Sequence, residues 1–141
     1  MGLTWVYNAV TKTWSEGPKM NTERYHHSCF ADKTTSSIHV MGGKDNQWNI
    51  LNSTEMWTLG QKSWQPSANL PEAIDWSSAV ASNTDEFVGY MAGGVTRSRV
   101  LHYIYGLRRG DMTWIKSNNT IKMGRYGHSL LNIPANQVLG C

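Results

Sequence analysis

Two histidines and a cysteine lie close together in the sequence, in an arrangement that could bind a metal ion. They are His26, His27 and Cys29. The surrounding residues are typical of a strand, in which neighbouring side chains point to opposite faces of a sheet, so the two histidines cannot easily share one ion. The second cysteine, Cys141, completes no zinc-binding spacing. We therefore expect no metal and no cofactor, and we expect Cys29 to be a buried thiol.

Other residue patterns that carry chemistry are missing or weak. The sequence has no nucleophile elbow, phosphate-binding loop or zinc-protease motif, so it predicts no catalytic residues and no enzyme. Four arginines cluster at Arg97, Arg99, Arg108 and Arg109, but the net charge is only +3. Solvated strand and turn residues explain this cluster better than a phosphate-binding patch does. We expect no nucleic-acid partner.

The composition is that of a folded domain. Of the 141 residues, 40% are hydrophobic and 16% are charged, which excludes a disordered chain. No apolar run approaches the roughly 18 residues of a membrane helix, so no membrane insertion is expected. The N-terminal residues lack a secretory signal pattern, which favours the cytoplasm. Asn52 and Asn118 stand in glycosylation triplets, which keeps an extracellular location open.

Several features recur at a period of about 50 residues, so a repeat architecture must position any functional side chains. Three tryptophans are evenly spaced 50 residues apart, a glycine pair recurs after 51, and an Arg-Tyr-x-His-Ser run recurs after 101. The positions are Trp14, Trp64 and Trp114; Gly42-Gly43 and Gly93-Gly94; and residues 24–28 and 125–129.

The residues between these marks are typical of short strands. Apolar and β-branched runs at 37–41, 86–92 and 100–105 are separated by turn-forming residues. Each glycine pair directly follows such a run. A glycine pair at a strand end permits positive φ and a close approach of neighbouring backbone. Four short strands in about 50 residues are typical of one blade of a β-propeller.

The combined pattern resembles the kelch repeat and covers nearly the whole chain. The resemblance implies an all-β fold, an incomplete kelch-type β-propeller of about three blades of four-stranded antiparallel sheet. We expect residues 1–20 to form outer strands of a first blade, 21–68 a second blade, 69–117 a third, and 118–141 the inner strands of a fourth. Propellers close with about four to eight blades. The range 1–141 is therefore expected to be part of a larger propeller; the alternative is that several copies assemble into a ring.

The sequence departs from the kelch pattern at four places. Ile74, Asp75 and Trp76 stand where an inner-strand arginine is expected, and Trp57 replaces the usual tyrosine. Tyr105 lies nine residues before Trp114 instead of seven, which predicts a longer turn there. The last copy stops at 139–141, about where a glycine pair would fall.

The resemblance also implies where a partner would bind. In kelch adaptors, arginines at the positions of Arg24 and Arg125 line the mouth of the central channel and bind acidic peptides. The planar guanidinium group is suited to this because it can donate two parallel hydrogen bonds to a carboxylate. The alternative is that each arginine caps a loop of its own blade. The loops at 44–52 and 67–75 are expected to open on the same face. Trp48 would be an interface anchor there or would fold back as loop packing. The predicted partner-binding residues are Arg24, Trp48, Asp75, Arg97 and Arg125.

The sequence thus predicts a protein-protein interaction module that binds a protein or peptide through propeller loops. Kelch substrate adaptors and actin-associated kelch proteins bind partners in this way. The resemblance therefore implies a ubiquitin-ligase scaffold or actin as the partner. The alternative is that the chain is part of a kelch-propeller enzyme, or part of a carbohydrate-active or extracellular protein.

Overall fold

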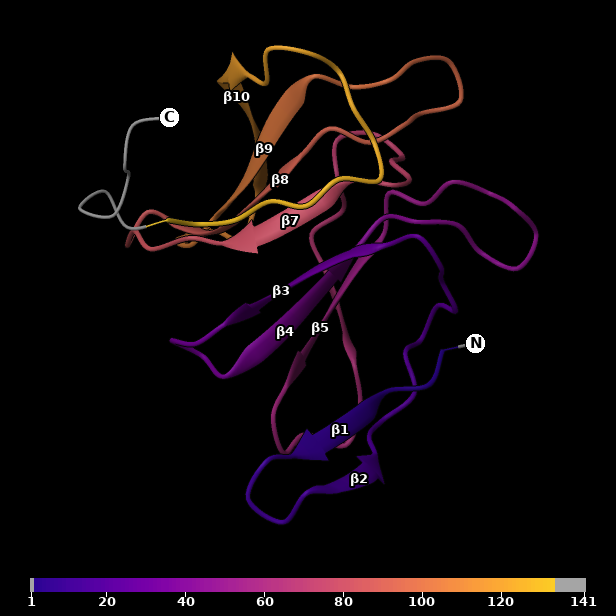
Figure 1. Cartoon of the computed structure of the whole chain (residues 1–141), viewed down its shortest axis with the longest axis vertical. Helices are drawn as coiled ribbons and strands as arrows, with labels where there is room; N and C mark the ends of the chain where they lie inside the picture. The colour runs from indigo at the N-terminus through magenta and orange to yellow at the C-terminus, as the bar shows by residue number, and fades with distance from the viewer. Residues whose placement is uncertain (1, 134–141) are drawn as a thin grey trace.

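The computed structural model of the chain describes residues 2–133, in which it contains strands and no helix. Three antiparallel sheets of two, four and four strands follow one another along the chain (Figure 1). The strands are β1 (Trp5–Asn8), β2 (Thr13–Glu16), β3 (Ser28–Asp32), β4 (Ser37–Met41), β5 (Thr54–Thr58), β6 (Gln65–Ser67), β7 (Ser78–Ala81), β8 (Phe87–Ala92), β9 (Tyr103–Arg108) and β10 (Trp114–Thr120). The prediction of an all-β fold is confirmed.

Both four-stranded sheets are meanders, in the orders β3-β4-β5-β6 and β7-β8-β9-β10. Figure 1 shows the two sheets side by side, with the β1–β2 hairpin beyond the first; the described residues do not close into a ring. This arrangement agrees with an incomplete propeller. Residues 121–133 follow β10 without forming a strand, and the predicted end of the last copy at 139–141 lies outside the described residues. The division into four blade segments remains a prediction.

The strand registers show the period directly. Trp14 lies opposite Tyr7, and Trp114 lies opposite Leu107. Trp64 directly precedes β6, and its ring centroid is 6.0 Å from that of Trp57. In each hairpin the two residues are seven apart, so the predicted longer turn before Trp114 is wrong. Leu107 occupies the position where the pattern expects an aromatic residue, and Tyr105 lies elsewhere on β9.

The apolar residues form two clusters, one on each side of the β3–β6 sheet. The larger cluster joins the two four-stranded sheets, with Phe30 and Met41 on one side and Met91, Leu107 and Trp114 on the other. The smaller cluster lies between the β3–β6 sheet and the hairpin. It contains Met20, Val40, Trp57 and Trp64, with Val6 packed against it. Burying one such large side chain stabilises the fold by on the order of 2–3 kcal/mol.

The two glycine pairs follow β4 and β8 and hold each sheet against the next segment of chain. All four glycines have positive φ, from +63° to +98°. The N–H of Gly43 donates to the Ile74 carbonyl at 2.8 Å, and the N–H of Gly94 donates to the Arg125 carbonyl at 2.8 Å. A Cβ at Gly42 would lie 2.3 Å from the Ile74 oxygen. Any other residue type would therefore separate these two backbone segments.

Arg24 lies inside the first four-stranded sheet and forms an ion pair with Glu55 on β5. Its Nη2 is 2.8 Å from Glu55 Oε1, and its Nη1 donates to the carbonyls of Gly42 and Ser53. Burial alone would raise the pKa of Glu55, but the hydrogen bonds from Arg24, Thr22 and Asn21 hold that pKa below its usual value. The pair thus ties the segment before β3 to the loop after β4.

The second four-stranded sheet replaces this ion pair with apolar contact. Ile74 lies 50 residues after Arg24, and Tyr105 lies 50 after Glu55. Both are almost completely buried in the larger apolar cluster. The hydroxyl of Tyr105 reaches out to donate to Glu72, and burial followed by this contact raises the pKa of Tyr105. Buried ion pairs can often be replaced by packed apolar residues without loss of stability. Ile74 can therefore stabilise the second sheet at the position where the pattern expects an arginine.

The glycine contacts predict a measurable difference between two glycines of similar φ. Gly43 (φ +84°) would place a Cβ 2.5 Å from the Tyr25 oxygen, whereas Gly60 (φ +89°) would place one in open space. We expect Gly43→Ala to lower the free energy of unfolding by about 1–3 kcal/mol. Gly60→Ala should lower it by only about 1 kcal/mol, the cost of the backbone conformation. Urea denaturation compares the variants, and equal losses would contradict the close-approach explanation.

The exchange of Arg24 and Glu55 for the residues of the second sheet is a further test. Arg24→Met should destabilise the protein by about 3–5 kcal/mol, because it leaves the Glu55 carboxylate buried without its partner. The double variant Arg24→Ile with Glu55→Tyr copies Ile74 and Tyr105 and should recover most of that loss. Thermal and urea denaturation of the single and double variants measure it. A double variant no more stable than Arg24→Met would show that the two sheets are not equivalent here.

Candidate functional site

Four inter-strand segments come together at one end of the sheets and form what we call the loop face: residues 18–27, 42–53, 68–77 and 93–102. Backbone bridges join Tyr25 to Lys44 and Asp75 to Val95, and the N–H of Ile74 donates to the Leu51 carbonyl. Figure 1 shows the loops after β4 and β8 projecting toward the same side. The prediction that both loop types open on one face agrees with this geometry.

Four aromatic rings gather on the loop face. The ring centroids of His26 and Trp76 are 3.8 Å apart, those of Tyr25 and His26 are 4.7 Å apart, and those of Tyr25 and Trp48 are 5.7 Å apart. Trp48 is 73% exposed and Trp76 is 40% exposed. These four residues form a continuous aromatic cluster that combines internal ring contacts with a large accessible area.

The backbone places these rings through an unusual conformation that recurs from one segment to the next. His26, Trp76 and Gly127 stand at equivalent positions, and all three have positive φ of +54° to +62°. The N–H of Trp76 donates to the His26 carbonyl, and the N–H of Gly127 donates to the Trp76 carbonyl. Successive segments therefore stack, and each presents the same position to solvent. The side chain at that position decides the local chemistry.

Trp48 is presented by a turn that its own neighbours close. Its φ is +65°, and its N–H donates to the Asp45 carbonyl at 3.0 Å. The carboxylate of Asp45 accepts hydrogen bonds from the backbone N–H groups of Gln47 and Asn49. The indole contacts Tyr25 edge-on at the base of the cluster. Trp48 thus packs against a neighbouring loop and remains mostly exposed, and its role as an interface anchor stays a prediction.

Charges lie beside the aromatic cluster. The buried Asp75 carboxylate is 2.9 Å from Lys44 Nζ, and its Oδ1 is 3.7 Å from His26 Nδ1. Lys44 Nζ also lies 6.0 Å from the centre of the Trp48 ring. Asp75 was predicted to contact a partner, but it is 1% exposed. It acts on this face by pairing with Lys44, whose ammonium group solvent reaches.

The predicted arginines have different environments. Arg24 is wrong as a surface contact, because its side chain has no exposed area and its Nη1 and Nη2 groups are bonded inside the sheet. The loop-capping alternative describes it. Arg125 is exposed, and its Nε donates to the Met123 carbonyl. Arg97 is exposed in the loop after β8, beside a shallow hollow of about 260 Å³ that Glu72 and Arg99 also line. The structure therefore places Trp48, Arg97 and Arg125 at the surface and Arg24 and Asp75 beneath it.

Sequence reasoning treated His26 as a potential metal ligand and Trp76 as a departure from the pattern, and it missed their contact. Aligning residues 24–28 with 74–78 would have placed these two residues at one repeated position. His27 points elsewhere, into a hollow that Cys29 also lines. Burial, followed by the charge of Arg24, lowers the pKa of His27.

Cys29 is exposed, so its prediction as a buried thiol is wrong. It lies on the side of β3 that faces away from the second sheet. Within residues 2–133, no group of three or more His, Cys, Asp or Glu side chains could hold a metal ion. The same residues contain no helix long and apolar enough to cross a membrane.

Comparisons with known proteins agree with the repeat architecture. No protein-family model matches the chain. Alpha-scruin of Limulus polyphemus is 32% identical over 96 residues, which are 68% of this chain and 10% of that protein. Beta-scruin of the same animal is 34% identical over 88 residues, 62% of this chain and 9% of that protein. An F-box/kelch-repeat protein of Arabidopsis thaliana is 29% identical over 109 residues, 75% of this chain and 27% of that protein.

The chain thus spans about a tenth of the scruins and about a quarter of the plant protein. The similarity covers most of the chain, in which the glycine pairs, the spaced hairpins and the stacked inner segments recur. From the repeated sequence, the all-β meanders and these relatives, we conclude that the chain belongs to the kelch-repeat family.

Proposed function

We propose that this chain is a protein-interaction module and that its loop face binds a protein or peptide segment. The observation that carries the proposal is the aromatic cluster of Tyr25, His26, Trp48 and Trp76, of which Trp48 is 73% exposed. Tryptophan and tyrosine dominate the binding energy of protein interfaces, because each buries a large rigid area at little cost in conformational entropy. A cluster that is already packed internally also needs little reordering when it binds.

Charged groups surround the cluster, and several of them pair with one another. Lys44 pairs with the buried Asp75 and Arg99 pairs with Glu72, while Arg97 is exposed in the loop after β8. Rim charges of this kind mainly accelerate association and select among partners. The kelch resemblance extends the proposal to two classes of protein partner, a ubiquitin-ligase scaffold or actin.

The opposite end of the two four-stranded sheets has a different composition. Its turns, at residues 33–36 and 82–86, consist mainly of polar side chains. Leu59, in the turn after β5, is one of the exposed large apolar residues there, and it is 65% exposed. Leu59 therefore provides a matched control, because it is apolar and similarly accessible and lies away from the loop face.

Substitution of the two tryptophans tests the proposal. Peptides selected from a displayed random library against the immobilised chain serve as ligands, and calorimetry measures their affinity. We expect Trp48→Ala and Trp76→Ala each to weaken binding by about 2 kcal/mol, which corresponds to roughly 30-fold in Kd. Leu59→Ala should leave the Kd unchanged. Selected ligands that bind both tryptophan variants as tightly as the parent chain would place the binding surface elsewhere.

A further inference from the structure

The charges directly beneath the aromatic cluster cancel within the chain itself. Lys44 Nζ is 2.9 Å from the Asp75 carboxylate, and the other oxygen of that carboxylate, Oδ1, is buried. Arg24 and Glu55 form a second pair, in which the two side chains are 0% and 4% exposed. The base of the cluster therefore has no net charge to attract an acidic or a basic group. An uncharged occupant avoids the cost of dehydrating a charge there.

Other carboxylates of the loop face are also engaged. Both oxygens of Asp45 accept hydrogen bonds within its own loop, and Glu72 pairs with Arg99. Arg97 and Arg125 are exposed in neighbouring segments of the loop face. An acidic partner would therefore have to act through these two arginines, because the Arg24 side chain is used inside the sheet.

The cluster has hydrogen-bond donors that the chain does not use. Within residues 2–133, the indole N–H groups of Trp48 and Trp76 have no hydrogen-bond partner, whereas those of Trp57 and Trp64 donate to backbone carbonyls. Trp48 and Trp76 are also the partly exposed tryptophans of this face. An indole N–H usually has an acceptor once its ring is buried, so a partner that covers these rings must supply acceptors.

A proline-containing segment in the polyproline II conformation meets both requirements. Such a segment is extended, makes no internal hydrogen bonds and leaves its carbonyls free to accept. Proline is uncharged and has no backbone N–H that would need an acceptor on the loop face. Proline-rich peptides bind in grooves lined by aromatic side chains, and their preformed backbone loses little entropy on binding.

We propose that the aromatic cluster binds an uncharged, proline-containing, extended segment of a partner protein. The rings pack on its prolines and apolar side chains, and the two unused indole N–H groups donate to its carbonyls. From Trp48 through Tyr25 and His26 to Trp76, successive ring centroids are 5.7, 4.7 and 3.8 Å apart. Polyproline II advances about 3.1 Å per residue, so at most about five residues cover the row.

The proposal rests on the function proposed above for the loop face, and it specifies the chemistry of the partner. That chemistry differs from the acidic peptides that the kelch resemblance implies. The physical reason is that the ion pairs with Glu55 and Asp75 occupy Arg24 and Lys44, the cations nearest to the rings.

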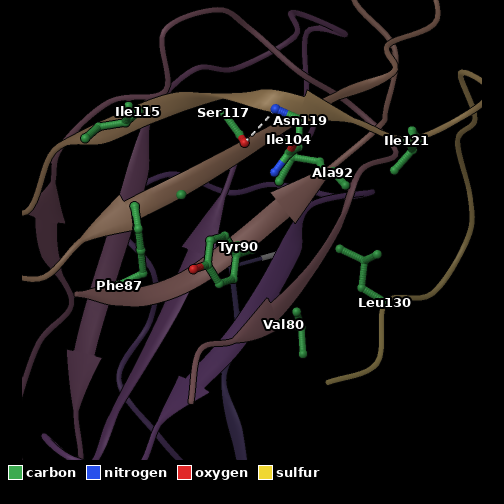
Figure 2. Close-up of a pocket in the computed structure, with 11 residues that line it drawn as sticks. Val80, Phe87, Tyr90, Ala92, Ile104, Ile115, Ser117, Asn119, Ile121 and Leu130 are labelled. Atoms are coloured by element: carbon green, nitrogen blue, oxygen red, sulfur yellow. Dashed lines mark hydrogen bonds between the residues drawn. The ribbon is translucent and has the colours of Figure 1, made fainter. Parts of the chain in front are cut away.

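A second apolar surface provides a comparison. Figure 2 shows a hollow of about 500 Å³ on the β7–β10 sheet, with Phe87, Tyr90 and Ile115 along it. Among the described residues that line this hollow, none is a tryptophan. The equivalent side of the β3–β6 sheet packs against the next sheet through Phe30 and Met41. The hollow is thus suited to another sheet, whereas the cluster on the loop face is suited to a single extended segment.

The first test uses peptides selected from a displayed random library against the immobilised chain. We expect the selected peptides to contain proline and to have no net charge. Between about 0.1 M and about 1 M sodium chloride the Debye length falls from about 10 Å to about 3 Å, and their Kd should change less than about twofold. Trp48→Ala should weaken binding roughly 30-fold. Arg97→Gln with Arg125→Gln, and Ile115→Gln in the hollow of Figure 2, should leave the Kd unchanged.

The outcomes separate this proposal from the proposed function. Peptides that require Trp48 but lack proline would overturn the proline-containing ligand and leave the loop face as the binding surface. The same holds for acidic peptides that bind about tenfold or more weakly at high salt and in the double arginine variant. Peptides that Trp48→Ala leaves unaffected, or that Ile115→Gln weakens, would overturn both proposals.

The second test observes the indole N–H groups directly by NMR. On titration with acetylated and amidated deca-proline, the indole signals of Trp48 and Trp76 should shift, and those of Trp57 and Trp64 should not. Deca-glutamate with the same end groups should shift none of the four. Unshifted Trp48 and Trp76 signals with deca-proline, or shifts of these two with deca-glutamate, would overturn the proposal.

The hydrogen bond itself is tested by Trp48→Phe, which keeps an aromatic ring and removes the N–H. This variant should weaken the selected peptides by about fivefold, the contribution of one hydrogen bond, and so by less than Trp48→Ala. An unchanged Kd in Trp48→Phe would contradict the donated hydrogen bond. A loss equal to that of Trp48→Ala would contradict packing on the ring.

Discussion

The close approach of backbone at the glycine pairs is the constraint on which the rest of the structure depends. Gly43 and Gly94 each donate a hydrogen bond to the segment that leads into the next inner strand. That contact leaves no room for a Cβ. It sets the spacing between successive sheets, and the apolar cluster between them packs at that spacing. Backbone contacts therefore set how the sheets stack, and the side chains fill the remaining volume.

Since the backbone contacts fix the loops, the side chains on the loop face are free to differ. Lys44 and Val95 make equivalent bridges but expose different chemistry. His26, Trp76 and Gly127 share one conformation, yet they present an imidazole, an indole and no side chain. A repeated backbone thus presents different side chains from one segment to the next, which is the arrangement a binding module requires. Specificity resides in a few positions whose geometry the repeat supplies.

The sequence predicted the strands, the glycine positions and the period because these follow from local backbone requirements. It did less well for single side chains. Arg24 was assigned to the surface because the kelch resemblance places such arginines at the mouth of the channel, and its partner Glu55 is 31 residues away. Leu107 was missed because the pattern was followed by residue type instead of by register. The exposure of Cys29 depends on what covers β3 on its outer side, which a single strand cannot reveal.

The exchange of the Arg24–Glu55 pair for Ile74 and Tyr105 makes the two sheets respond differently to acid. The pKa of Glu55 is lowered in the folded protein, so the stability that this carboxylate contributes is present above its unfolded pKa and is lost as the pH falls toward the folded value. Ile74 has no such group. Acidification would therefore weaken a buried contact in the β3–β6 sheet that the β7–β10 sheet replaces with Ile74 and Tyr105.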